Sequence, residues 1–374
     1  MLLWLGELIV ASWALSYGAE HLSVRYGAKF IGRTVLSIAT TLPEIAIVAY
    51  AAAAGNYGIA IGAGLGSNLL MMTLGLSIML IIATTRLSKA PLRGLDVSSF
   101  KLDKIFLFIT AIVSAVLFFD GYNYLDGFIF VVMFIAYFIM ALREMKVDKN
   151  NELLSSISNK NNESTRQNND EYKNNDKNHP IREATTTTAA ATVGKSEPVR
   201  ENFQDVSKAP RRRLMNALLI FIAGIVGILI GAEPFIHSLE GVSIDIGISA
   251  IVLSVIISPI AGEMPEKLSL MILARKGAHG ASIAISNVLG SKILNNTLLL
   301  AIAVFGAIYH GGFYSTIGAN TLLSYQMILV TIVTIAALIP MLKKEIGLRV
   351  GMMLLGLYVV GLIIQFFLPH QTHT

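Results

Sequence analysis

Hydrophobic residues run along most of this chain in long stretches, separated by short polar connections and by one long polar segment. The stretches approach the ~20 residues that a helix needs to cross the hydrocarbon core of a membrane. They lack the ten-residue alternation that is typical of strands in a membrane barrel. The pattern therefore predicts an all-α integral membrane protein. Its ten transmembrane helices are expected at about residues 2–24, 30–54, 57–84, 102–119, 123–143, 214–236, 244–274, 280–309, 321–342 and 346–368.

The long polar segment, residues 147–213, differs in composition from the rest of the chain. It holds asparagine-rich stretches, a run of threonines at 185–188, few aromatic residues and mixed charge. Such a composition cannot bury enough apolar surface to form a core. We therefore divide the chain into a first five-helix repeat (1–146), a flexible loop (147–213) and a second five-helix repeat (214–374). The loop is interpreted as a tether, with a regulatory role as the alternative.

The charged residues predict how the helices are oriented. Only 14% of the residues are charged, against roughly a quarter in a soluble domain. Apart from Lys267 and Lys292, which lie deep inside predicted spans, every Lys and Arg falls in one alternating set of connections or in the span ends that border it. Because basic connections face the cytoplasm, we expect a multi-pass protein of the cell membrane with both termini outside and loop 147–213 in the cytoplasm. The basic balance of +5 then reflects topology and contact with membrane lipid, and indicates no nucleic acid.

Two matching pairs of motifs indicate a duplicated architecture. A Pro-Glu motif lies on the second predicted helix of each half, and a Gly-Ser motif lies on the third. Since five helices per half is an odd number, two similar halves insert in opposite orientations. Inverted repeats of this kind bring paired motifs together near the bilayer midplane. The sequence thus predicts two inverted-topology five-helix repeats with one shared site.

The Pro-Glu motifs point to cation chemistry. They read Thr-Thr-Leu-Pro-Glu at 40–44 and Gly-Glu-Met-Pro-Glu at 262–266. A carboxylate at membrane depth is costly and marks a functional site by default, and a proline in a helix frees backbone carbonyls. Carboxylate, carbonyl and hydroxyl oxygens are the ligands that Ca²⁺ prefers. The alternative is a proline kink whose glutamate pairs with a structural base.

These motifs resemble the sodium/calcium exchanger family, within the cation/Ca²⁺ antiporter superfamily. The family's repeats read G-[TS]-S-L-P-E on one helix and G-[ND]-x-x-G-S-N on the next. Residues 40–44 and 65–68 match the first repeat, and Pro265, Glu266 and 289–291 match the second. The resemblance covers essentially the whole chain and implies an exchanger-like fold. It also implies a metal site in which Glu44 and Glu266 bind Ca²⁺, with oxygens from Thr40 and Thr41.

The chain also departs from the family pattern around this site. The family's Asn on the third helix is Ala63 here, and the matching acidic position in the second half is Asn287. Glu263 adds a third carboxylate, and Lys267 and Lys292 add two ammonium groups. We include Glu263 and Asn287 among the candidate metal ligands.

The two lysines are candidates for charge balancing or coupling. Glu263 and Lys267 are four residues apart and would pair on an intact helix. Lys292 is the stronger candidate to occupy a vacated cation subsite or to carry a coupling proton. The alternatives for Lys292 are snorkelling or pairing with Glu7 or Glu20.

We therefore expect a secondary active antiporter that exports a divalent cation, with Ca²⁺ as the leading candidate, in exchange for Na⁺ or H⁺ by alternating access. These ions are transported, and no resident cofactor is expected. The alternative is a cation channel or passive divalent-cation pore. Neither H-E-x-x-H nor G-x-S-x-G occurs, which argues against an enzyme. The absence of cysteine excludes disulfides and thiolate metal sites. One chain contains both halves, so a monomer would suffice.

Overall fold

The structure is a computed structural model that describes residues 1–23, 37–144 and 211–368. Contacts divide the chain into two compact units, one formed by Met1–Ile139 with Ala209–Thr374 and the other by Met140–Lys208. Every element discussed below belongs to the first unit, except for the end of the helix Tyr124–Glu144. Most of the predicted loop 147–213 lies outside the described residues, so the proposed domain boundaries stay a prediction.

The helices of the first half follow the predicted bounds closely, although the start of the second predicted span lies outside the described residues. A π-helical segment, η2, interrupts the third span without ending it. Short elements follow this span, the strand β1 (Leu95–Asp96) and the 3-10 turn η3 (Ser98–Phe100). The helices are α1 (Leu2–Ser23), α3 (Ser37–Ala53), α4 (Tyr57–Leu70), η2 (Met71–Gly75), α5 (Leu76–Thr84), α6 (Lys101–Leu117) and Tyr124–Glu144.

The second half corrects two predicted bounds. The predicted span 214–236 is the start of a longer helix that continues through Pro234 to Ile246, because a proline does not always end a helix whose neighbours pack around it. The predicted span 244–274 is two helices that meet at Glu263. The elements are α8 (Arg211–Ile246), α9 (Ala250–Gly262), α10 (Met264–Ala274), α11 (Ala278–Leu294), η5 (Asn295–Leu299), α12 (Leu300–Gly311), α13 (Thr321–Leu338), η6 (Ile339–Leu342), β2 (Glu345–Ile346) and α14 (Leu348–Phe367).

The break between α9 and α10 has a local cause. Pro265 lacks an amide donor, which is tolerated in the first turn of a helix but not in its interior. The chain accordingly starts a new helix at Met264, with proline in its first turn. Glu263 joins the two helices, and its amide still donates to the carbonyl of Pro259 at 3.1 Å.

Apolar helices dominate the described part of the chain. Six of its helices are long and apolar enough to cross a membrane, and three shorter apolar helices accompany them. Many of the large hydrophobic side chains on the outer faces of α8 and α14 are exposed, as expected for helices that face lipid rather than water. The protein is therefore a helical, multi-pass membrane protein.

Several features of the two halves match each other. The π-helical segments η2 and η5 each begin shortly after a Gly-Ser motif. Strand β1 of the first half pairs antiparallel with β2 of the second. An antiparallel bridge joins Tyr122 to Ile317. Because β1 precedes α6 and Tyr122 follows it, these two connections lie at opposite ends of that helix.

Helix α4 packs closely on α9 because its glycines carry no side chain. A Cβ at Gly66 would lie 2.0 Å from the carbonyl oxygen of Val255, and one at Gly62 would lie 3.1 Å from that of Ile251. The hydroxyl of Ser254 in α9 donates to the carbonyl of Ile59 in α4 at 2.7 Å. Small residues allow such close approach between membrane helices. The approach brings α4 to the helix that ends at the Glu263 break.

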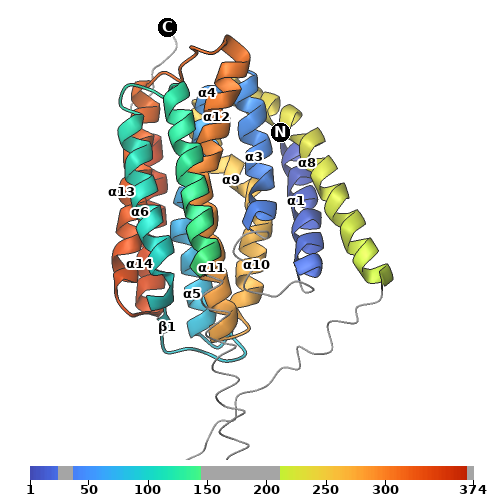
Figure 1. Ribbon diagram of the computed structural model, residues 1–374, viewed down its shortest axis with the longest axis vertical. Coiled ribbons are helices and arrows are strands. Elements are labelled where there is room, and N and C mark those ends of the chain that lie inside the picture. The colour runs from blue at the N-terminus through green and yellow to red at the C-terminus, as the bar shows by residue number, and fades with distance from the viewer. Residues whose placement is uncertain (24–36, 145–210, 369–374) are drawn as a thin grey trace, which may run out of the picture. The chain divides into compact units, whose positions relative to one another are not determined.

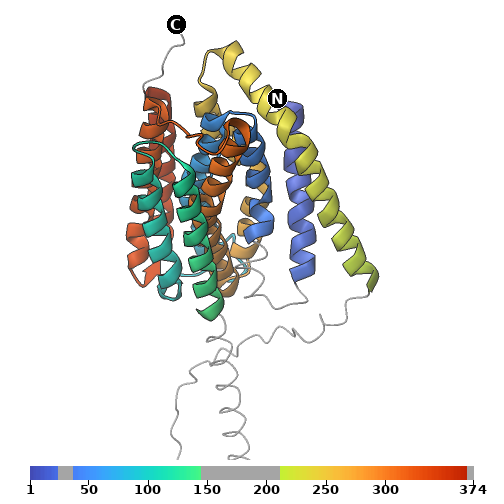
Figure 2. The same cartoon turned by 45° about the horizontal axis from the view of Figure 1, so that its top comes forward.

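Helices α1 and α8 lie side by side at one edge of the bundle (Figures 1 and 2). Their interface is also built on glycine. A Cβ at Gly224 would lie 2.5 Å from the amide nitrogen of Leu15, and one at Gly231 would lie 1.7 Å from the Glu7 carboxylate. The two backbones therefore approach each other with few intervening side chains.

Candidate functional site

Polar and charged side chains from four segments meet inside the bundle. The segments are α3, the region of α4 around its Gly-Ser motif, the α9–α10 break, and α11 with the start of η5. Almost every side chain discussed here is buried, with an exposed fraction of 3% or less. Buried polar groups are costly unless they are paired or bind a ligand, so the partners of each group show what the site can do.

Glu44 is buried in α3, and neither oxygen of its carboxylate has a hydrogen-bond partner. Its side chain packs against the backbone of Gly262, where an added Cβ would lie 3.0 Å from Cγ and 3.1 Å from Oε1. Glu44 is also within electrostatic range of Glu263, Glu266 and Lys292. The glycine that ends α9 therefore makes room for this carboxylate beside the two acids of the second half.

Glu266 lies in the first turn of α10 and is held by neutral donors. The hydroxyl of Ser291 donates to Oε1 at 2.8 Å, and the side-chain amide of Asn287 donates to the same oxygen at 3.3 Å. The N-terminus of a helix also favours a negative charge. The structure thus brings Asn287 to Glu266, and its amide acts there as a donor.

Glu263 forms an ion pair with a buried lysine. The Lys292 ammonium forms an ion pair with Glu263 Oε1, and both side chains are fully buried. The hydroxyl of Ser67 donates to the same oxygen, and it accepts hydrogen bonds from Lys292 Nζ and from Asn295 Nδ2, each at 2.6 Å. The other oxygen, Oε2, has no partner. Lys292 therefore pairs with Glu263, and neither snorkels nor pairs with Glu7.

The remaining predicted site residues are placed less centrally. Lys267 is partly buried and its ammonium donates to the carbonyl of Pro259 at 3.2 Å, so the pairing expected from its four-residue spacing to Glu263 is replaced by a backbone contact. Thr41 is buried in α3 next to the Pro-Glu motif. Thr40 belongs to α3, but its side chain lies outside the described part of the chain.

Several residues of this cluster were not among the site residues predicted from the sequence. Ser67 and Ser291 belong to the Gly-Ser motifs and were not among the predicted ligands, yet each one contacts a glutamate. Asn295 reaches Ser67, and Asn68 donates to Asn296 Oδ1 at 2.5 Å. The signal that could have found the asparagines is their position just after the Gly-Ser motifs, one turn along the same face.

The described residues contain no group of three or more His, Cys, Asp or Glu side chains arranged to hold a metal ion. The three glutamates are near one another in electrostatic terms, but each is oriented toward different partners. Glu44 is bare, Glu266 accepts from neutral donors, and Glu263 is paired with Lys292. In this conformation the site therefore holds three acids, and the negative charge of each one has a different set of partners.

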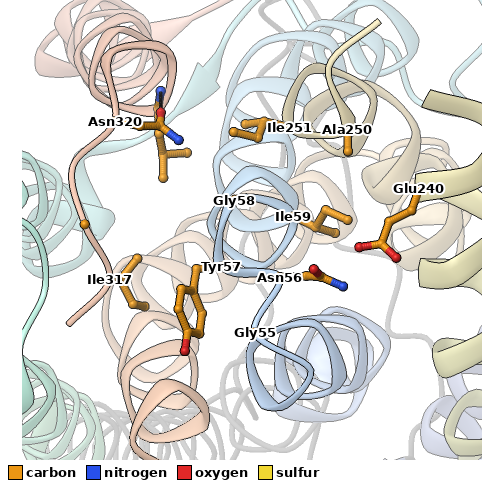
Figure 3. Close-up of a pocket in the computed structure, with 12 residues that line it drawn as sticks. Gly55, Asn56, Tyr57, Gly58, Ile59, Glu240, Ala250, Ile251, Ile317 and Asn320 are labelled. Carbon is orange, nitrogen blue, oxygen red and sulfur yellow. Dashed lines mark hydrogen bonds between the residues drawn. The ribbon is translucent and has the colours of Figure 1, made fainter. Parts of the chain in front are cut away.

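Two cavities are lined by residues other than these acids, one near the first residues of α4 and α9 and the other between the end of α3 and α8. One has a volume of about 310 Å³ and includes Asn56, Glu240 and Asn320 in its lining. Figure 3 shows the Glu240 side chain pointing toward Asn56. The other, of about 240 Å³, is lined in part by Glu233 and His237.

Comparison with known proteins gives a family match over most of the chain. Residues 1–143 and 216–367 match the family model described as "Sodium/calcium exchanger protein". An uncharacterized membrane protein of Methanocaldococcus jannaschii is 24% identical over 349 residues, which covers 92% of this chain and 90% of that protein.

Solved structures share the fold. A crystal structure of an H⁺/Ca²⁺ exchanger aligns with a TM-score of 0.71 at 18% identity, covering 99% of this chain and 81% of the other. A sodium-calcium exchanger, NCX_Mj, solved with Na⁺ and Sr²⁺, aligns with a TM-score of 0.57 at 22% identity, covering 97% and 96% of the two chains.

Proposed function

Because the chain belongs to the sodium/calcium exchanger family, we propose that it is a secondary active antiporter. It exports a divalent cation, with Ca²⁺ as the leading candidate, in exchange for Na⁺ or H⁺ by alternating access. The solved structures that share its fold include an H⁺/Ca²⁺ exchanger and a sodium-calcium exchanger. Both coupling ions therefore enter the proposal.

The carboxylate of Glu44 carries this proposal. It is 2% exposed and has no hydrogen-bond partner for either oxygen. Burying an ionised carboxylate without a partner is expensive, whereas a bound cation or proton removes that cost. The second acid, Glu266, lies within electrostatic range, and a divalent cation is the natural bridge between two such groups.

The proposed cation site is built around this pair. Glu44 and Glu266 supply the charged oxygens, and Thr40 and Thr41 add hydroxyl or carbonyl oxygens from the same turn as Pro43. Of the two further candidates, Glu263 is paired with Lys292, so we keep Asn287 as a ligand, in a state in which its present hydrogen bond to Glu266 rearranges. Hard cations such as Ca²⁺ take six to eight oxygens of these kinds, so a closer approach of the four segments accompanies binding.

We further propose ten transmembrane helices in two inverted five-helix repeats. Support comes from the equivalent positions of η2 and η5 and from the two matching connections, β1 with β2 and Tyr122 with Ile317. By the positive-inside rule, both termini lie outside the cell membrane and residues 147–213 lie in the cytoplasm. The cavities near Asn56 and Glu233 then open on the outer side.

The test is transport by the purified protein in liposomes. We expect Ca²⁺ flux against its gradient when either a Na⁺ or an H⁺ gradient is imposed, and we expect Glu44→Gln to abolish this flux. Asp245→Asn, which removes an exposed carboxylate at the end of α8, is the matched control and should transport normally. Flux that runs only down the Ca²⁺ gradient, with unitary currents, would instead identify a channel or pore. If neither gradient drives flux that depends on Glu44, the proposal is wrong.

A further inference from the structure

The ion pair between Lys292 and Glu263 lies at the centre of the acid cluster. Its two side chains come from α11 and from the α9–α10 break, and neither is more than 1% exposed. The ammonium also donates to the hydroxyl of Ser67 in α4. Lys292, which belongs to α11, therefore contacts two other segments that build the site, α4 and the α9–α10 break.

The groups around this ammonium are those that a small cation would use. A carboxylate oxygen and a hydroxyl oxygen both face Nζ, and the hydroxyl is further oriented by the side-chain amide of Asn295. Oxygens of this kind are the ligands of alkali and alkaline-earth cations in proteins. A lysine ammonium is a compact point charge that can stand in for such an ion.

The equivalent position in the first half carries no charge. Gly290, Ser291 and Lys292 correspond to Gly66, Ser67 and Asn68 in the two Gly-Ser motifs. Asn68 donates to Asn296 and contacts no carboxylate through that bond. The positive charge has therefore been added to one half only, on the side where the chain also has the additional carboxylate Glu263.

We propose that Lys292 is a tethered cation that permanently occupies one cation subsite of the exchanger. It neutralises Glu263 in every transport state and removes that carboxylate from the transported ions. This inference rests on the proposed function, because it concerns the charges exchanged at the same site. The carboxylates left for transported ions are Glu44 and Glu266, while Lys267 lies nearby and donates to a backbone carbonyl.

The consequence is a defined charge stoichiometry. Two carboxylates bind one divalent cation or two monovalent counter-ions, so the wild-type protein should exchange one Ca²⁺ for two Na⁺ or two H⁺. Without the ammonium, Glu263 is a buried and unpaired carboxylate, which costs free energy until a mobile cation joins it. In Lys292→Met one Ca²⁺ can serve all three carboxylates in one state, whereas three monovalent ions are needed to neutralise them in the other, so one additional monovalent ion should be exchanged in each cycle.

The measurement is the reversal potential of Ca²⁺ flux in proteoliposomes with set Na⁺, H⁺ and voltage gradients. We expect wild type to be electroneutral at two counter-charges per Ca²⁺ and Lys292→Met to become electrogenic at three. Lys292→Arg, which keeps the charge, should stay at two. Lys276→Met removes an exposed lysine after α10 and serves as the matched control, also at two.

If the single variant fails to fold, the neutral double variant Lys292→Met/Glu263→Gln provides a second test. It removes both members of the pair and should return the stoichiometry to two. If Lys292→Met exchanges ions with an unchanged stoichiometry, or if the double variant exchanges with three counter-charges, the inference is wrong. Loss of gradient-driven flux in the wild type would instead overturn the proposed function, so the two failures are distinguishable.

Discussion

The two Pro-Glu motifs of this chain occupy helices of different construction. In the first half, α3 runs through Pro43 without interruption, and Glu44 lies in its interior. In the second half the helix ends at Gly262, and Glu266 lies in the first turn of a new helix. Nearly the same motif thus gives a carboxylate without hydrogen-bond partners in one half and, in the other, a hydrogen-bonded carboxylate in the first turn of a helix.

This difference indicates a division of labour between the two acids. Glu266 is held in place by Ser291 and Asn287, whereas Glu44 has both oxygens available. In the proposed cation site, the fixed acid would provide a preorganised half, and the bare acid would gain most from the arrival of a cation. Substitutions of the bare acid, of a contact to the fixed acid and of the packing between α4 and α9 test this difference.

The largest effect is expected from removing the bare acid. Glu44→Gln should lower the apparent Ca²⁺ affinity, read from the rise in unfolding temperature with added Ca²⁺, by about 30-fold or more. Losing a charged partner costs about 2–5 kcal/mol, and each tenfold in affinity is about 1.4 kcal/mol. Stability without Ca²⁺ should be retained, because a neutral amide replaces an unpaired carboxylate. Asp245→Asn is the control. A variant that keeps wild-type Ca²⁺ stabilisation would contradict the proposed role of Glu44.

Removing the close contact between α4 and α9 should have an intermediate effect. In Gly66→Ala the new Cβ would lie 2.0 Å from a backbone carbonyl oxygen, which cannot move aside as a side chain can. We expect a loss of about 1–3 kcal/mol, typical of overpacking, seen as a lower unfolding temperature in detergent. At Gly356 in α14 nothing lies within 4 Å of an added Cβ, so Gly356→Ala should change little. Equal stability of the two variants would argue against tight α4–α9 packing.

The smallest effect is expected at the fixed acid. Ser291→Ala removes the 2.8 Å hydrogen bond to Glu266 but leaves the contact from Asn287. A single hydrogen bond contributes about 1 kcal/mol, so the apparent Ca²⁺ affinity should fall about fivefold in transport assays. Ser99→Ala, at an exposed position before α6, is the control. A loss as large as that of Glu44→Gln would show that the two acids are not divided as described.

Much of the fold could be predicted because it follows from hydropathy alone. The spans at 57–84 and 346–368 match Tyr57–Thr84 and Leu348–Phe367 within two residues. The end of α8 was missed because Glu233, His237 and Glu240 are typical of a polar connection, whereas the helix continues past them. The α9–α10 break was missed because a proline is compatible with either a kink or a new helix start.

The chemistry of the site was only partly predictable. The sequence singled out Glu44, Glu266 and Lys292 because charges at membrane depth are rare. Helical spacing made Lys267 a possible partner for Glu263, while the observed partner is Lys292, twenty-nine positions away. Spacing rules describe only one helix at a time. Contacts between helices, including those of Ser67 and Asn295, depend on tertiary packing that no local pattern encodes.

The backbone pairings at the two ends of α6 restrict how such a protein can open. They fasten the loops that lead into α6, Tyr124–Glu144, α13 and α14 to one another by main-chain hydrogen bonds. These four helices therefore form a frame that backbone hydrogen bonds hold together at both ends of α6. Under the proposed alternating access, the movement that exposes the acids to each side would fall to helices outside this frame, and the glycine-lined interface between α1 and α8 is well suited to sliding.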